Sequence, residues 1–175
     1  MTERIIIAGS GGQGIMLLGK VLAEAALFND KFVTWLPAYG PEVRGGCAYC
    51  MVTLADDEIG SPYVDKADTL IIMNQASLSK FRNRLKPGGL MVINSSLASP
   101  QGEPEIKSVS GRFTDIAIGL GNIKVANMVA LGGYLAGKNI INPENIVKAM
   151  KKMAPKGQPE LLQVNLKALK KGMGL

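Results

Sequence analysis

The sequence predicts an α/β fold, a single three-layer Rossmann-like domain over residues 1–175 with a mixed, largely parallel sheet. Three observations lead to it. Strand-like apolar runs alternate with helical patterns, as in βαβ units. Glycine clusters end the strands sharply. The polar stretch 55–67 between two strand-like runs favours some antiparallel pairing.

The N-terminal half supplies the first of these elements. Residues 5–8 are β-branched and apolar, which predicts a buried strand ended by glycines. Apolar residues then recur at helical spacing and predict a helix over 13–28. Strands are expected at 32–36 and at 47–54, the second ending in a turn at 56–57.

The middle of the chain repeats this alternation. Asp68 precedes an apolar strand expected at 69–73, and a helix is expected from Asn74 toward Leu85. A Pro-Gly-Gly turn separates that helix from a buried strand at 90–94. Residues 95–110 are polar and contain prolines, which predicts a surface loop.

The C-terminal third is predicted to be helical. A short segment at 113–120 precedes a glycine-bearing helix at 125–135. Asn142 caps a helix that runs to Met150, and Pro159 opens a last helix that runs to Lys170.

Composition excludes several classes of function. There is no histidine, so His-based catalytic triads and His metal ligands are excluded. The net charge of +6 suits anionic substrates or acidic partners. Most C-terminal lysines fit solvated helix faces, and without interleaved aromatic residues or arginines they do not predict nucleic-acid binding. No signal peptide or membrane span is visible, which predicts a cytoplasmic protein without membrane contact.

The two cysteines, Cys47 and Cys50, have C-x-x-C spacing but lie in a strand-like run. Residues three apart in a strand face opposite sides, so two separate buried thiols are expected rather than a redox pair. An iron–sulfur cluster held by this chain alone is excluded, because such clusters take about four cysteines.

A glycine-rich turn links the first strand to the first helix. Backbone N–H groups at such a helix start attract anions, and small residues let a ligand approach. Gly9, Gly11 and Gly14 match the dinucleotide pattern G-x-G-x-x-G. Gln13 has two open roles here: to contact a ligand, or to satisfy free N–H groups at the helix start.

The rest of the dinucleotide signature is missing. Dinucleotide-binding domains usually place an acid at the end of the second strand, to hold the ribose. That strand ends here at Trp35-Leu36-Pro37, and Asp30 and Glu42 are both misplaced. No Lys-Ser/Thr pair follows the glycines, so a P-loop is excluded as well.

A second loop over residues 37–46 is stiffened by prolines and carries three glycines. It projects Tyr39, Glu42 and Arg44. Constrained loops with such side chains usually meet a ligand or another chain, although a Glu42–Arg44 ion pair could instead simply hold the loop together.

Both loops together resemble the gamma subunit of the 2-oxoacid:ferredoxin oxidoreductases, over nearly the whole chain. The segments at 9–14 and 39–46 carry the resemblance, and residues 68–72 and 127–132 look like later landmarks of that family. The form Tyr-Gly-Pro-Glu before the second glycines favours the pyruvate, 2-oxoisovalerate or 2-oxoglutarate branch, and 2-oxoglutarate is the expected substrate.

The resemblance implies an assembly with alpha, beta and delta subunits that makes an acyl-CoA from a 2-oxoacid. Thiamine diphosphate, Mg and [4Fe-4S] clusters would lie in those partner subunits, which would also contact ferredoxin. This chain would bind none of them and would serve as a structural and gating subunit. It would have no catalytic and no metal-binding residue, and a contact with CoA is expected of it.

The site residues expected from the resemblance form two overlapping sets. The residues expected to face the cofactor CoA are Gly9, Ser10, Gly11, Gly12, Gln13, Gly14 and Arg44. The residues expected at a subunit interface are Tyr39, Gly40, Pro41, Glu42, Arg44, Gly45, Gly46 and Asn127.

Two other functions remain open at the level of sequence. One is a standalone Rossmann-like oxidoreductase that binds NAD or a flavin. The other is an interaction module without any ligand, whose glycines only permit close packing against another chain.

Overall fold

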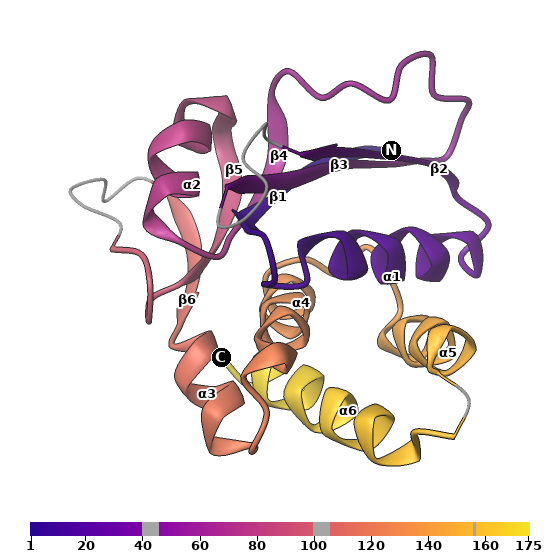
Figure 1. The fold of residues 1–175 in the computed structure, drawn as a ribbon. Coiled ribbons are helices and arrows are strands. Elements are labelled where there is room, and N and C mark those ends of the chain that lie inside the picture. The colour runs from indigo at the N-terminus through magenta and orange to yellow at the C-terminus, as the bar shows by residue number, and fades with distance from the viewer. Residues whose placement is uncertain (40–45, 100–105, 156) are drawn as a thin grey trace.

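The computed structural model describes residues 1–39, 46–99, 106–155 and 157–175. Its centre is a six-stranded sheet with the order β2-β3-β1-β4-β5-β6 (Figure 1). The strands are β1 Thr2–Ser10, β2 Phe32–Tyr39, β3 Cys47–Ala55, β4 Ala67–Ile72, β5 Leu85–Asn94 and β6 Lys107–Gly111. β1, β4, β5 and β6 pair in parallel, whereas β2 and β3 pair antiparallel, so the predicted mixed sheet is confirmed.

Helices cover the sheet unequally. They are α1 Ile15–Leu27, α2 Gln75–Phe81, α3 Phe113–Gly119, α4 Ala126–Gly137, α5 Pro143–Met153 and α6 Pro159–Met173, with short 3-10 turns η1 Arg82–Arg84 and η2 Ile123–Val125. One face of the sheet packs against α1 and α4, which α5 and α6 cover from outside, and α2 lies on the other face (Figure 1). The protein therefore has three layers: a thick helical layer, the sheet, and a thin layer formed by α2.

Both faces of the sheet are buried. Alternate residues of β1 show this: Ile5 and Ile7 pack under the thick helical layer, and Ile6 and Ala8 pack under α2. All four are fully buried, as expected for a central strand. In the described part of the chain, no helix has the length and apolar character needed to cross a bilayer.

Two predictions about elements were wrong. The predicted surface loop 95–110 contains β6, an edge strand paired with β5. The helix expected up to Leu85 ends at Phe81, and after η1 the strand β5 begins at Leu85, ahead of the predicted turn. Non-local pairing with a neighbouring strand decides both cases, and it overrides the local preference of polar and glycine residues.

Candidate functional site

The glycine turn lies where β1 ends and α1 begins, at the carboxyl edge of the parallel strands. Gly14 is the N-cap of α1 and has a φ of 71°, and Gly12 has a φ of 91°. These left-handed angles favour glycine. Gly14 has no side chain that could cap the helix, so the N–H groups of the first turn receive no hydrogen bond from the N-cap residue.

Only part of this turn is open to a ligand. A Cβ at Gly9 would lie 2.6 Å from Gln13 Oε1 and 2.7 Å from Ile15 Cδ1, so the chain itself fills that space. Among the described residues, nothing lies within 4 Å of a Cβ placed at Gly11 or Gly12. The accessible backbone is therefore at Gly11 and Gly12 (hereafter the open glycines).

Gln13 turns inward rather than toward the mouth of the turn. Its Oε1 accepts a hydrogen bond from Ser10 N at 2.7 Å, and its Nε2 donates to Met73 O at 3.3 Å. Neither predicted role matches these bonds, because the N–H that Gln13 accepts belongs to Ser10 of β1 rather than to the helix start: the amide ties the end of β1 to the end of β4. In Rossmann domains the dinucleotide lies over this crevice.

Further amides, which the sequence patterns did not single out, close the same crevice. Asn94 Nδ2 donates to Met73 O at 3.2 Å and to Thr114 Oγ1 at 2.8 Å. Asn74 caps α2 and donates from Nδ2 to Ser10 Oγ at 2.5 Å. Their signal in the sequence is a polar residue directly after, or at the end of, an apolar strand.

Asn127 was predicted at an interface, but it is 1% exposed and packs inside the chain. Its Nδ2 donates to Gly14 O at 3.1 Å. A Cβ at Gly14 would collide with this amide. Asn127 therefore contacts the glycine turn, and its direct partner is this chain rather than another subunit.

The two loops singled out by the sequence meet. Gly11 N donates to Gly46 O at 3.2 Å, which places the end of the second loop beside the open glycines. Tyr39 ends β2, and the other predicted residues of this loop, Gly40 to Gly45 with Glu42 and Arg44, lie outside the described residues.

The cysteines face opposite sides of β3, as predicted, and both are free. Cys50 is buried, and burial raises the pKa of its thiol to about 12. Cys47 is only partly buried, contrary to the prediction of two buried thiols. Within the described ranges, no group of three or more His, Cys, Asp or Glu side chains could hold a metal ion.

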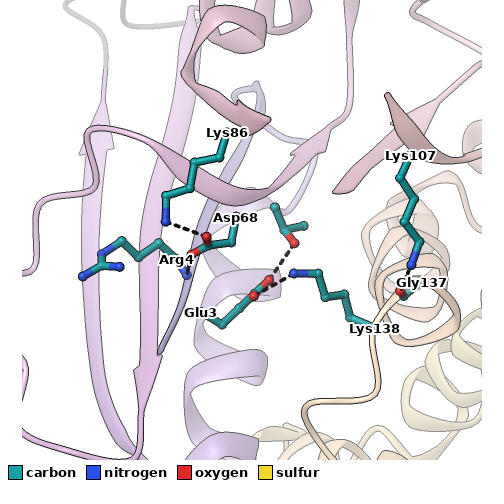
Figure 2. Close-up of polar contacts among 8 residues, drawn as sticks. Glu3, Arg4, Asp68, Lys86, Lys107, Gly137 and Lys138 are labelled. Atoms are coloured by element: carbon teal, nitrogen blue, oxygen red, sulfur yellow. Dashed lines mark hydrogen bonds and ion pairs between the residues drawn. The ribbon is translucent and has the colours of Figure 1, made fainter. Parts of the chain in front are cut away.

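A second polar cluster lies at the opposite, amino edge of the parallel strands (Figure 2). Glu3 is 3% exposed, and it accepts from Thr69 Oγ1 at 2.6 Å and from Lys138 Nζ at 2.8 Å. Burial and the charge of Glu3 both raise the pKa of the buried Tyr134 phenol. Since each carboxylate oxygen accepts a hydrogen bond, this cluster fastens β1 to β4 and to the end of α4.

These features define a class of protein: a Rossmann-like α/β domain in which side-chain amides of the chain itself hydrogen-bond at the ends of β1 and β4, where Rossmann domains bind a dinucleotide. At its carboxyl edge, the exposed Gly11 and Gly12 of the first glycine-rich loop lie beside Gly46, the end of the second loop.

Comparison with known proteins assigns the family. The family model for pyruvate ferredoxin/flavodoxin oxidoreductase matches residues 4–175. The chain therefore belongs to the pyruvate ferredoxin/flavodoxin oxidoreductase family.

Relatives of two kinds are similar to the chain. It is 35% identical to the 2-oxoglutarate synthase subunit KorC of Methanocaldococcus jannaschii, covering 98% of this chain and 92% of the relative. It is 36% identical to the ketoisovalerate oxidoreductase subunit VorA of Methanothermobacter thermautotrophicus, covering 97% of this chain. It spans only 35% of that VorA relative.

A solved structure supports the fold. The keto/oxoacid ferredoxin oxidoreductase gamma subunit from Geobacter sulfurreducens superposes with a TM-score of 0.84 at 28% identity. The match covers 98% of this chain and 96% of that one. The predicted gamma-type α/β fold is thereby confirmed.

Proposed function

We propose that this chain is the gamma subunit of a multi-subunit 2-oxoacid:ferredoxin oxidoreductase of the cytoplasm. The observation that carries the proposal is the family match over residues 4–175. Such an enzyme oxidatively decarboxylates a 2-oxoacid, joins the acyl group to CoA and passes two electrons to ferredoxin.

The proposed substrate is 2-oxoglutarate. This choice is supported by the relative named as a 2-oxoglutarate synthase subunit, which matches over 92% of its own length. The test is a panel of 2-oxoacids offered to the complete complex with CoA and an electron acceptor. We expect the highest kcat/KM with 2-oxoglutarate, whereas a preference for 2-oxoisovalerate would overturn the choice.

The chain itself is proposed to be an accessory subunit with a structural and gating role. Its two cysteines lie on opposite faces of β3 and do not fit an iron–sulfur cluster. Thiamine diphosphate, Mg and the clusters are therefore assigned to alpha, beta and delta subunits. Assay of the complex with and without this chain tests the role: we expect activity to depend on its presence.

The surface proposed to face CoA consists of the open glycines, the neighbouring Gly46 and Arg44. CoA carries several phosphates, which suit a free backbone N–H group and an arginine chemically. Since Gly11 N already donates to Gly46 O, the N–H of Gly12 is the proposed backbone donor. The fit rests on the open space above Gly11 and Gly12. Ser10 and Gln13 already bond within the chain, so we assign them to shaping the turn.

Replacement of Arg44 tests the CoA contact in the complete complex. We expect Arg44→Ala to raise the KM for CoA about tenfold with little change in kcat, as for loss of one charge-assisted contact. Arg112→Ala is the matched control, because Arg112 is exposed and pairs locally with Asp115. An unchanged KM for CoA in Arg44→Ala would refute the contact.

A further inference from the structure

The outer face of α2 and η1 carries an unusual density of positive charge. Every second residue from Lys80 to Lys86 is a lysine or arginine. Residues 63–86 hold five cations and two carboxylates. This face lies on the side of the sheet opposite the thick helical layer (Figure 1).

Aromatic rings hold these cations in place. Lys80 Nζ lies 5.3 Å from the centroid of the Tyr49 ring, and Tyr49 packs at 4.9 Å against Phe81. Arg84 Cζ lies 5.3 Å from the Tyr63 ring and 5.9 Å from the Phe81 ring. The cations and rings thus form one continuous stack along α2 and η1.

Backbone carbonyls fix the same surface further. Arg84 Nε donates to Asp65 O at 2.8 Å, and Lys66 Nζ donates to Asn83 O at 2.7 Å. At the amino edge, Asp68 holds Lys86 Nζ at 2.5 Å and the backbone N–H of Arg4 at 2.8 Å (Figure 2). Charged side chains that are already ordered lose little entropy when a partner binds.

We propose that this face, defined by Arg4, Tyr63, Lys66, Lys80, Arg84 and Lys86 and called the α2 basic surface, docks an acidic surface of a sister subunit. Cations outnumber carboxylates on this surface, so a partner surface with an excess of negative charge would complement it. Tyr63 is 57% exposed beside Arg84, and tyrosine and arginine are the residues enriched at the centres of protein interfaces.

The same surface is poorly suited to nucleic acid. Phe81 is buried and Lys80 lies over Tyr49, so these rings are not available to stack on bases. The carboxylate of Asp65 is exposed within the surface and would repel phosphates, whereas it suits a protein partner of mixed charge.

The docking proposal rests on the gamma-subunit role, and one experiment separates the two. The chain is tagged, co-expressed with the other subunits, immobilised, and washed with KCl from about 0.05 to 1 M, where salt progressively screens surface charge. The other subunits retained at each step are quantified. If wild type retains none at the lowest salt, the subunit role itself fails.

The decisive variant is Lys66→Glu with Lys80→Glu, which reverses two exposed charges of the α2 basic surface. At the salt concentration where wild type retains half of its partners, we expect about tenfold less retention. The matched control is Lys167→Glu with Lys171→Glu, the same charge change at exposed positions of α6. Circular dichroism of each variant verifies folding.

Three results would overturn the proposal. The first is unchanged retention by the α2 variant, and the second is an equal loss in the α6 control, which would indicate a general effect of net charge. The third is co-purification of nucleic acid with the wild-type chain but not with the α2 variant, detected by the ratio of absorbance at the nucleic-acid and protein maxima.

Discussion

At the scale of single residues, neighbouring glycines of one turn have opposite requirements. Gly14 needs a left-handed angle and space beside Asn127, whereas Gly11 needs neither. Gly14→Ala is therefore expected to lower the free energy of unfolding by about 2–4 kcal/mol. Gly11→Ala should stay within about 1 kcal/mol of wild type in the same urea titration.

A double-mutant cycle identifies the cause. If the added methyl group collides with Asn127, the pair Gly14→Ala and Asn127→Ala should lose less stability than the sum of the single changes, by at least about 0.5 kcal/mol. Strict additivity would attribute the cost to backbone strain alone.

The buried carboxylate of Glu3 gives a second prediction at this scale. Lys138→Met would leave that carboxylate without its cation, at an expected cost of about 3 kcal/mol. Lys86→Met is the control, because Asp68 and Lys86 are both partly exposed; its cost should stay under about 1 kcal/mol (Figure 2). Both are measured by urea unfolding.

A second substitution tests the buried charge itself. Adding Glu3→Gln to Lys138→Met removes the uncompensated carboxylate, so part of the lost stability should return. No recovery would mean that the lysine stem, rather than its charge, stabilises the end of α4.

At the scale of elements, α4 and α6 pack backbone against backbone. A Cβ at Gly132 would collide with Leu169 O, and a Cβ at Gly172 would collide with Val129 O. Since carbonyl oxygens of a helix cannot move aside, Gly132→Ala should cost about 3 kcal/mol or displace α6. Thermal unfolding measures the loss of stability, and hydrogen exchange of the α6 amides measures the displacement of α6.

Gly119→Ala, in α3, is the matched control. Nothing lies within 4 Å of its added Cβ, and alanine favours the helix, so a gain of about 0.5–1 kcal/mol is expected. If both variants lost equal stability, close packing of α4 on α6 would not explain the need for Gly132.

Elements with strong periodicity were predictable, and the others depended on distant neighbours. The apolar run of β1 and the spacing of α1 identified both elements because burial on one or two faces dictates those residues. β6 was missed because it is an edge strand with the polar pattern Lys-Ser-Val-Ser-Gly, in which Val109 packs against the core. Such a strand forms only because β5 offers it a partner.

The candidate site, too, was predictable only in part. The sequence predicted two loops, and Gly11 and Gly46 join them in the structure. It did not predict that Gln13 would fill the space above Gly9, because the choice between ligand and chain depends on the position of Met73, directly after β4.

At the scale of the whole molecule, the two edges of the sheet differ in charge. The carboxyl edge presents the open glycines, and the amino edge presents Arg4, Lys66 and Lys86. Because the edges are separate, CoA bound at the carboxyl edge would not compete with a subunit docked near the amino edge. Addition of CoA to the complete complex should therefore change one edge alone.

Hydrogen exchange of the complex, with and without CoA, tests this separation. Peptides that cover residues 9–14 should exchange several-fold more slowly with CoA, because the backbone N–H of Gly12 would then gain an acceptor, whereas that of Gly11 already donates to Gly46 O. Peptides that cover 80–86 should show no change, since a docked subunit already protects them. Slowing at 80–86 with none at 9–14 would reverse the assignment of the two edges.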